Sequence, residues 1–579
     1  MKKLIPLAAS ALLAACATTS QPAAAPPVTV QVLGLNDFHG ALEPPNQSVT
    51  IVRSEEDIVR IPAGGAAWLA SALTTLRSQH AHSITVAAGD MTGASQLASA
   101  LYLDEPSVRV LSELGVELNA VGNHEFDRGW RELKRLQEGG CEKLSERDPC
   151  KLEPFEGASF AYLAANVIMP DGSTLFPATA LRSFGEGESQ VTLGFVGLTL
   201  QDTDKLVAPA GIEGIRFGDE VEAINRGVAS LDAEGADAIV VLIHQGIKTF
   251  AAPDPNGCGE PTGPLERIMQ GIDPRVDVIV SGHTHWAYVC EWPSSDPGHM
   301  FLLTSAGVFG ALVSDITLEI DPASGEVISK SANNVVVQSR PYRSSVRYVE
   351  NTDLYPRFEP DPGIETYIAQ YVEAAEAFTQ RPIGRVSRRA DKGEGAESNR
   401  GKELGRLIAD AQLAATREAG AQIALMNPFG IRAPLQPAED GTLTYGDIAR
   451  TQPFNNTLVT QNFTGAQLKR VLEQQFEGED PEQFLSPSAG FAYTFDRSRP
   501  VGDRIVAMTL DGVPIEPDAI YRVTTNSFLA SGGDSFAALT EGTQAVEQGT
   551  DIDALEAYIR AVPVREVPFQ DGVIEASAD

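Results

Sequence analysis

Histidine is rare in this chain, and most of its histidines stand beside acidic or amide residues. Of the eight, five occur in four short motifs that follow apolar runs: NDFHG, GNHEFD, IHQG and GHTH. A further apolar run ends in AAGD. Open α/β sheets collect their ligands outside the carboxyl ends of their strands. The motifs therefore predict one shared polar region made of Asp37, His39, Asp90, Asn123, His124, Asp127, His244, His283 and His285.

A mixture of imidazole nitrogens with carboxylate and amide oxygens is typical of a site for divalent metals. Asp37 and His39 are two residues apart, so an extended backbone would point both side chains the same way. Gly89 allows a tight turn before Asp90, whose two oxygens can bridge two ions, and Asn123 adds a neutral oxygen. We expect two ions, which the residue types leave open between Zn, Mn, Fe and Co. The expected ligands are Asp37, His39, Asp90, Asn123, His244, His283 and His285.

The motif GNHEFD places two different polar side chains next to each other. A surface turn could use Asn and Asp for local hydrogen bonds. If Asn123 binds metal, however, His124 is available as a general acid or electrostatic partner at the reacting group. Asp127 can accept from its other ring nitrogen, which fixes the tautomer and raises the imidazole pKa. Four other strand ends carry similar polar residues, which favours a catalytic pair over a surface turn. A two-metal site would activate water for an in-line displacement.

The elements that must position these residues follow an α/β pattern in the first half of the chain. Apolar runs that predict buried strands alternate with amphipathic segments. These runs are 28–35, 83–89, 117–122, 191–199, 237–244 and VDVIVSG just before His283. A β-meander at 312–338 closes this part of the chain.

A segment bounded by prolines, 362–380, has apolar residues at helical spacing and predicts a linking helix. The second half has its own mixture of elements, with a helix at 403–419 and strands near 421–426 and 519–526. With 579 residues the chain is too long for one hydrophobic core, so two domains are expected.

The net charge of −34 argues against polymeric nucleic acid as a partner, because phosphate backbones need a basic surface. One local exception lies between 381 and 406, where eight Lys or Arg outnumber four Asp or Glu. This basic patch could face a small anion. The oligomeric state is not indicated.

The N-terminal segment MKKLIPLAASALLAAC predicts export. Two lysines precede an apolar stretch that is too short to span a membrane. The segment ends in a pattern that resembles the lipobox of bacterial lipoproteins, which implies a signal peptide at 1–15 and lipidation of Cys16. An ordinary cleaved signal peptide is the alternative. Residues 16–27 are expected to form a tether, so the mature protein would be a membrane-anchored lipoprotein facing the periplasm or cell surface.

Export would place the four remaining cysteines in an oxidising compartment. An even number of cysteines in an oxidising compartment indicates two disulfides. Pairing of neighbours, Cys141 with Cys150 and Cys258 with Cys290, is the simplest of three arrangements. A thiolate metal site is not expected, because no CxxC motif occurs.

The ordered set DxH, GD, GNHEFD, H and GHTH resembles the calcineurin-like metallophosphatases. MNPFGIR, TQPFNNTLV and TNSFLASGGDSF resemble the C-terminal domain of the 5′-nucleotidase family, which includes bacterial periplasmic UDP-sugar hydrolases. The resemblance covers nearly the whole mature chain. It implies a four-layer α/β/β/α catalytic domain at 28–345, a linker with a helix at 346–382, and a smaller α+β substrate-binding domain at 383–579.

The resemblance also implies roles for residues of the second half. Phe454 and Phe528 match an aromatic pair that sandwiches a base, although ordinary core packing would also explain them. Asp534 matches a ribose-binding acid, and Arg400 is a candidate for a further phosphate-contacting arginine, with Arg388 and Arg389 as rivals. The implied substrate-binding set is Asn427, Arg432, Phe454, Asn456, Phe528, Asp534 and Arg400.

Two departures from the family pattern matter. Pro428 and Phe429 replace glycines of the usual NGGGIR loop, which stiffens and crowds it. His285 stands where some members have Gln or Asn. The implied activity is release of phosphate from 5′-nucleotides, and possible further substrates are UDP-sugars and 2′,3′-cyclic nucleotides. The alternatives are a thiosulfohydrolase or another phosphoesterase of the superfamily, and a non-catalytic nucleotide-binding lipoprotein, against which the complete ligand set argues.

Overall fold

The computed structural model describes residues 26–54, 57–145, 147–207, 209–249, 254–343, 348–393, 399–454, 456–477, 483–569 and 572–576. The signal-like segment at 1–15, Cys16 and most of the expected tether lie outside these ranges.

Two mixed six-stranded sheets form the body of the N-terminal domain. The first has the order β18-β17-β1-β4-β5-β6, in which β1, β4, β5 and β6 are parallel and β17 and β18 form an antiparallel edge. Its strands are β1 (Val28–Leu35), β4 (Ser83–Ala87), β5 (Val116–Ala120), β6 (Ala161–Leu163), β17 (Leu312–Ile320) and β18 (Val327–Val336).

The second sheet has the order β15-β16-β14-β11-β9-β8, with β9, β11, β14 and β16 parallel. Its strands are β8 (Thr179–Phe184), β9 (Val191–Thr199), β11 (Ala238–His244), β14 (Val276–Ser281), β15 (Ala287–Pro293) and β16 (Met300–Ala306). Short hairpins and bridges add β2 (Ser48–Ser54), β3 (Asp57–Pro62), β7 (Val167–Ile168), β10 (Arg216–Phe217), β12 (Lys248–Thr249), β13 (Pro261–Thr262), β19 (Tyr342–Arg343) and β20 (Tyr348–Val349).

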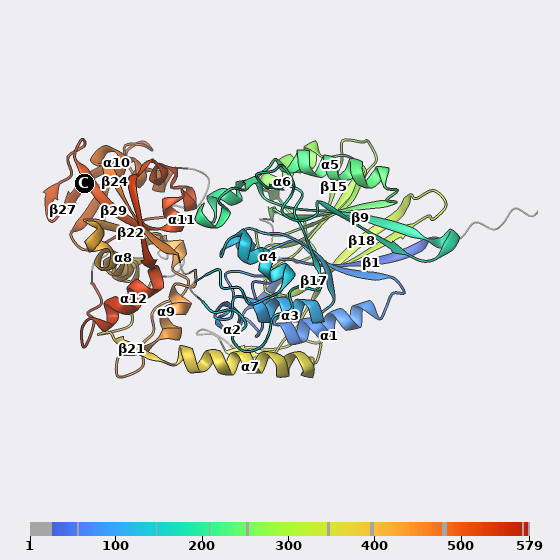
Figure 1. Cartoon of the computed structure of the whole chain (residues 1–579), viewed down its shortest axis with the longest axis horizontal. Helices are drawn as coiled ribbons and strands as arrows, with labels where there is room; N and C mark the ends of the chain where they lie inside the picture. The colour runs from blue at the N-terminus through green and yellow to red at the C-terminus, as the bar shows by residue number, and fades with distance from the viewer. Residues whose placement is uncertain are drawn as a thin grey trace, which may run out of the picture.

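The sheets pack face to face, and helices cover their outer faces, so the domain has four layers (Figure 1). Val32 and Val86 of the first sheet share one apolar core with Phe195 and Leu242 of the second. The central strands are buried on both faces, which explains their continuous apolar sequences. The helices are α1 (Ala66–Arg77), α2 (Leu97–Ala100), α3 (Glu105–Glu113), α4 (Trp130–Glu138), α5 (Glu220–Ala233) and α6 (Pro264–Gly271).

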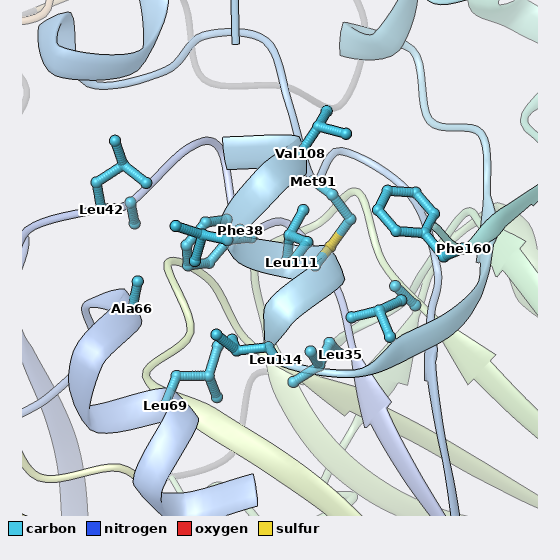
Figure 2. Packing of buried hydrophobic residues seen from close by; sticks show 14 of the residues in the cluster. Leu35, Phe38, Leu42, Ala66, Leu69, Met91, Val108, Leu111, Leu114 and Phe160 are labelled. Carbon is cyan, nitrogen blue, oxygen red and sulfur yellow. The ribbon is translucent and has the colours of Figure 1, made fainter. Parts of the chain in front are cut away.

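The core under the first sheet supports the loops that follow its strands. Figure 2 shows Leu69 of α1 and Leu111 of α3 beside Phe38 and Met91, which lie in the loops after β1 and β4. These loop side chains are 1% exposed. Close packing of this kind holds the polar residues between them in fixed positions.

The predicted linking helix is α7 (Pro362–Thr379), and it is built into the N-terminal domain. The Asp361 side chain caps its first turn, and Pro362 occupies a position where no hydrogen bond is lost. Ile364 and Ile368 are buried in the same core as α1 and α3. The helix therefore extends the N-terminal domain along its lower face in Figure 1 and ends beside the C-terminal domain.

The C-terminal domain has a five-stranded sheet of order β25-β22-β29-β24-β30 and a four-stranded sheet of order β28-β27-β26-β31. Its strands are β21 (Pro382–Arg385), β22 (Ile423–Met426), β23 (Thr442–Thr444), β24 (Thr457–Thr464), β25 (Ser486–Pro487), β26 (Phe491–Phe495), β27 (Ile505–Leu510), β28 (Val513–Pro514), β29 (Ile520–Asn526), β30 (Thr543–Thr550) and β31 (Val573–Glu575). Its helices are α8 (Lys402–Thr416), α9 (Tyr445–Thr451), α10 (Gly465–Glu473), α11 (Ser527–Ala530) and α12 (Asp551–Arg560).

The sequence patterns predicted these elements well. All six apolar runs of the first half are strands, and the expected helices at 362–380 and 403–419 are α7 and α8 with the short turn that follows α8. The expected meander is the β17–β18 hairpin at the edge of the first sheet. The α/β fold class is confirmed.

Candidate active site

The predicted metal ligands lie at the carboxyl ends of five parallel strands, where His244 is the last residue of β11 and the others lie in the loops that follow their strands. β1, β4 and β5 of one sheet and β11 and β14 of the other all end at the same edge of the sandwich. The structure brings together Asp37, His39, Asp90, Asn123, His244, His283 and His285.

Most of these ligands have a strained backbone. Asp37, His39, Asp90, His283 and His285 all have φ between 49° and 73°. This left-handed region disfavours residues other than glycine, and such strain is concentrated at functional sites. The expectation of an extended backbone at Asp37 and His39 is wrong. β1 ends at Leu35, and two left-handed turns aim both side chains at the site instead.

Two clusters of ligand atoms can each hold a cation. Asp37, His39 and His285 form one, and Asp90, His244 and His283 form the other, with the ligand atoms of each cluster within 4.8 Å of one another. In the first cluster the Nε2 atoms of His39 and His285 are 3.1 Å apart, with Asp37 Oδ1 3.5 Å from His285 Nε2.

Asp90 and Asn123 complete the arrangement. Asp90 Oδ2 lies 3.0 Å from His244 Nε2 and 3.8 Å from His39 Nε2, so this carboxylate lies between the clusters. Asn123 Oδ1 lies 3.2 Å from His244 Nε2 and 3.1 Å from His283 Nδ1. Asp90 therefore has ligand atoms of both clusters within 4 Å.

Hydrogen bonds from behind orient the histidine rings. His39 Nδ1 is 2.9 Å from the Gly93 carbonyl, and His244 Nδ1 is 2.8 Å from the Ala88 carbonyl. In each case Nδ1–H donates to the carbonyl oxygen, so the neutral form of the ring directs the lone pair of Nε2 into the site. Such partners fix the tautomer of metal-binding histidines.

Three of the four clustered histidines are held in their neutral form. Burial lowers the pKa of His39 and His283 to about 3 and that of His285 to about 4. Neutral imidazole is the form that binds metal. Burial also opposes a charge on His244, but Asp90 outweighs it and raises the pKa of His244 to about 9. The structure therefore favours a positive charge between His244 and Asp90, where a metal ion can replace the proton.

Two glycines allow close packing around His244 and Asp90. A Cβ on Gly89, which has φ +83°, would lie 2.7 Å from His244 Nδ1. A Cβ on Gly122 would lie 2.1 Å from Asp90 Oδ1. The AAGD and VGNHEF motifs therefore need these glycines for close approach of two loops.

Glu125 is a supporting residue that the sequence reasoning missed. It is 4% exposed, and its carboxylate accepts from the backbone N–H groups of Asp90 at 2.8 Å, Met91 at 2.8 Å and Gly122 at 2.6 Å. It therefore joins the loops after β4 and β5. Its place inside GNHEFD, between two predicted catalytic residues, was the available signal.

His124 and Asp127 form a pair at the edge of the metal cluster. His124 Nδ1 lies 2.9 Å from Asp127 Oδ2, and the two side chains are 25% and 29% exposed. Burial disfavours the imidazolium, but Asp127 and then Asp90 outweigh it and raise the pKa of His124 to about 10. The Nε2 side of the ring is thus a proton donor directed away from Asp127.

A cavity of about 340 Å³ connects this pair to the C-terminal domain. We call it the interdomain cavity. Asn123, His124 and His283 line it from the catalytic domain, with apolar Leu206 and Val207 beside them. From the C-terminal domain come Asn427, Phe429, Gly430, Arg432, Phe454, Asn456, Thr457, Asn526, Ser527, Phe528 and Asp534. Six of the seven residues predicted to bind substrate are among these.

The polar residues on the C-terminal side are held by one another. Asn427 Nδ2 donates to Asp534 Oδ2 at 2.7 Å, and Asn526 Nδ2 donates to Asn427 Oδ1 at 3.0 Å. Asp534 has φ +53°. Phe429 lines the cavity on the turn Pro428–Gly430, so the departure from the glycine-rich pattern adds an aromatic wall.

Arg400 is the predicted substrate residue that the structure places elsewhere. Its guanidinium donates to the Val573 carbonyl at 2.9 Å and stacks over Phe484 at 5.7 Å, and it lines a separate surface cavity. Its rivals are also engaged outside the interdomain cavity, Arg388 with Glu403 and Arg389 with Asp391. Local sequence could not show this, because Val573 and Phe484, which hold Arg400, are distant from it in the chain.

The cysteines of the described domains pair as neighbours. Cys141 bonds to Cys150, and Cys258 bonds to Cys290. Across the described ranges, every helix is too short or too polar to cross a bilayer.

Comparison with known proteins identifies both parts of the chain. Residues 30–287 match the family model of calcineurin-like phosphoesterases, and residues 377–541 match that of the 5′-nucleotidase C-terminal domain. A solved structure, the 5′-nucleotidase precursor from Thermus thermophilus, is 26% identical with a TM-score of 0.66 and covers 95% of this chain and 100% of that one.

Two relatives are similar to nearly the whole of this chain. The 5′-nucleotidase of Bos taurus is 24% identical over 594 residues, which cover 96% of this chain and 92% of that protein. "Endonuclease YhcR" of Bacillus subtilis (strain 168) is 30% identical over 539 residues, which cover 92% of this chain. This chain spans 40% of that relative's length.

Proposed function

Because this chain belongs to the 5′-nucleotidase family of metal-dependent, calcineurin-like phosphoesterases, we propose that it releases orthophosphate from nucleoside 5′-monophosphates. The observation that carries the proposal is the interdomain cavity. It joins metal ligands and His124 to aromatic and polar residues of the other domain. A general phosphatase would need only the metal ligands and His124, and not the aromatic and polar residues of the C-terminal domain.

The metal ligands divide into two sets with a shared carboxylate. Asp37, His39 and His285 would hold one divalent ion, Asn123, His244 and His283 the other, and Asp90 both. Two such ions activate water and neutralise charge on the phosphoryl oxygens of a bound ester. The ligand set contains no thiolate, so it suits Zn, Mn, Fe or Co.

His124 would assist departure of the ester oxygen. Its ring is fixed by Asp127 through Nδ1, so Nε2 carries a proton toward the cavity. Donation of that proton to the leaving 5′-oxygen would neutralise it as the bond to phosphorus breaks. The raised pKa of His124 keeps this proton in place near neutral pH.

The C-terminal wall would bind the nucleoside. Phe454 and Phe528 offer two rings against which a base can stack, and such stacking tolerates any base. Asp534, oriented by Asn427, is an acceptor for ribose hydroxyls. Arg432 lines the same cavity and offers a guanidinium to the phosphate.

We also propose that the protein works outside the cytoplasm. The signal-like segment and the two disulfides support export. Lipidation at Cys16 would tether the enzyme to a membrane. Palmitate labelling of the full-length chain and of Cys16→Ser tests this, because only the former should incorporate label.

A substrate panel tests the activity directly. Phosphate release from AMP, UMP, ADP and UDP-glucose would be measured by malachite green, with and without EDTA. Bis-p-nitrophenyl phosphate, 2′,3′-cyclic AMP and single-stranded DNA would cover the diesterase readings. AMP should be turned over with the highest kcat/KM among them, and loss of activity with chelator is required. A chain that cleaves only diesters or DNA would overturn the proposal, as would one that binds AMP without turnover.

A further inference from the structure

A second cavity, of about 320 Å³, approaches the metal ligands from another side. We call it the arginine cavity. His39 and Phe309 line it near the metal site, and Tyr445 of α9 lines it from the C-terminal domain. Asp127 and Phe454 line both cavities. The interdomain cavity thus reaches the ligands Asn123 and His283, and the arginine cavity reaches His39 of the other cluster.

Three arginines line the arginine cavity: Arg128, Arg147 and Arg450. Two of them have carboxylate partners. Arg128 pairs with the buried Asp104 at 2.5 Å, and Arg450 pairs with Asp447 at 2.5 Å. Among the residues that the structure describes, no carboxylate lies within ion-pairing distance of Arg147. The cavity therefore has an excess of positive charge.

Arg147 is held at this position by a closed loop. The disulfide between Cys141 and Cys150 joins the ends of the loop. The Cys150 N–H donates to the Glu105 carboxylate at 3.0 Å, and Glu105 pairs with Arg135 at 2.8 Å. The loop is thus anchored to α3 and α4, and the Arg147 guanidinium donates to the Ala100 carbonyl at 3.4 Å.

A half-buried guanidinium without a carboxylate partner is costly unless it meets an anion. Burial lowers the pKa of Arg147, and the nearby Arg128 adds repulsion. The Tyr445 phenol is its polar neighbour from the C-terminal domain. A guanidinium matches the oxygens of a phosphate group with paired hydrogen bonds. His39, one of the proposed ligands of the metal centre where the first phosphate would bind, forms part of the wall of the same cavity.

We infer that the arginine cavity binds a second phosphate group next to the one held at the metal centre, with Arg147 as its principal contact. This inference rests on the proposed function, because a first phosphate must occupy the metal site. A nucleoside triphosphate or diphosphate could place one phosphate in each position. Released orthophosphate leaving the metal site is the other source of the same chemistry.

Inhibition by anions with one, two or three phosphate groups tests this inference. Hydrolysis of p-nitrophenyl phosphate is followed at fixed free Mn²⁺, with orthophosphate, pyrophosphate or ATP as inhibitor. Arg147→Gln should raise the Ki of pyrophosphate and ATP about tenfold, the loss expected for a charge-assisted hydrogen bond. The Ki of orthophosphate and the KM for AMP should stay within twofold.

Control variants separate this role from folding and domain position. Arg131→Gln removes an exposed arginine of α4 and should change nothing. Arg147→Lys should restore part of the pyrophosphate affinity. Tyr445→Phe keeps the guanidinium and should leave every Ki within twofold, whereas an increase equal to that of Arg147→Gln would mean that Arg147 only positions the domains and would overturn the inference.

The remaining outcomes are distinct. If Arg147→Gln raises the Ki of orthophosphate as much as that of pyrophosphate, the second phosphate position serves the departing product. If no Ki changes while p-nitrophenyl phosphate is still hydrolysed, the inference is wrong and the proposed function stands. Failure of the wild-type enzyme to hydrolyse any phosphoester would instead contradict the proposed function.

Discussion

At the residue scale, two neighbours in one motif have different surroundings. Asn123 points its oxygen between two histidines, whereas His124 faces Asp127 at the edge of the cavity. The backbone N–H of His124 donates to Asp90 Oδ1 at 2.8 Å, so even this residue's main chain supports the proposed bridge. The side chains can therefore be tested separately.

His124→Ala should keep the metal content of the wild type and lower kcat by roughly 10²–10⁴, the usual contribution of general acid–base assistance. Asn123→Ala should lower the metal content, because it removes a ligand oxygen. Elemental analysis and AMP kinetics on both variants check this. Loss of a metal from His124→Ala would reverse the assignment of the neighbours.

Asp90→Asn should lose most of the bound metal, because one neutral amide replaces the carboxylate that lies between both clusters. Prolonged EDTA treatment of the wild type should abolish activity in the same way, and Zn, Mn or Co should restore it. Metal content and AMP turnover are measured together. Full activity in a sample shown to be metal-free would contradict the proposed metal-dependent mechanism.

At the scale of elements, the loops carry the proposed metal ligands and the helices support the loops. The ligand loops take left-handed turns that cost conformational energy, and the packed helices beneath them hold these turns in place. α7 contributes to this support, although its sequence suggested a linker. Its buried face contacts the core that contains Phe38 and Met91.

Ile368→Ala in α7 should lower the free energy of unfolding by about 2–5 kcal/mol, as expected for a large-to-small change in a packed core. Glu373→Ala, on the exposed face of the same helix, should change it by about 0.5 kcal/mol or less. Urea denaturation of both variants gives the comparison. Equal small effects would show that α7 is a loosely attached linker.

At the scale of the whole molecule, the site is shared by two domains. Rings from both meet across the cavity, with His124 and Phe454 6.4 Å apart and inclined by 17°. Chemistry at the metal ligands and recognition of the nucleoside are thus properties of different domains. Substrates that use one wall or both can distinguish them.

Phe454→Ala and Phe528→Ala should raise the KM for AMP about tenfold or more, because stacking on a base is worth about 1–3 kcal/mol. Hydrolysis of bis-p-nitrophenyl phosphate, which needs only the metal centre, should hardly change. Equal losses of activity on both substrates would show that these rings serve packing of the core and do not bind the base. Unchanged AMP kinetics in a folded variant would show that the base binds elsewhere.

The sequence by itself determined six central strands and the β17–β18 hairpin of the N-terminal domain, the strand ends that carry the polar residues, and six residues on the C-terminal side of the interdomain cavity. These follow from local patterns: apolar periodicity gives the strands, and chain order in a parallel sheet gives a common edge. The simplest arrangement of the four cysteines, pairing of neighbours along the chain, is also the one in the structure.

Only the tertiary structure decided features that depend on contacts between distant segments. The left-handed turns of Asp37 and His39 persist because the surrounding core holds them, and an isolated strand pattern predicts an extended chain instead. The outward position of Arg400 and the place of Arg147 in its cavity depend on which groups approach from other loops. Charge pairing across the fold has no signature in local sequence.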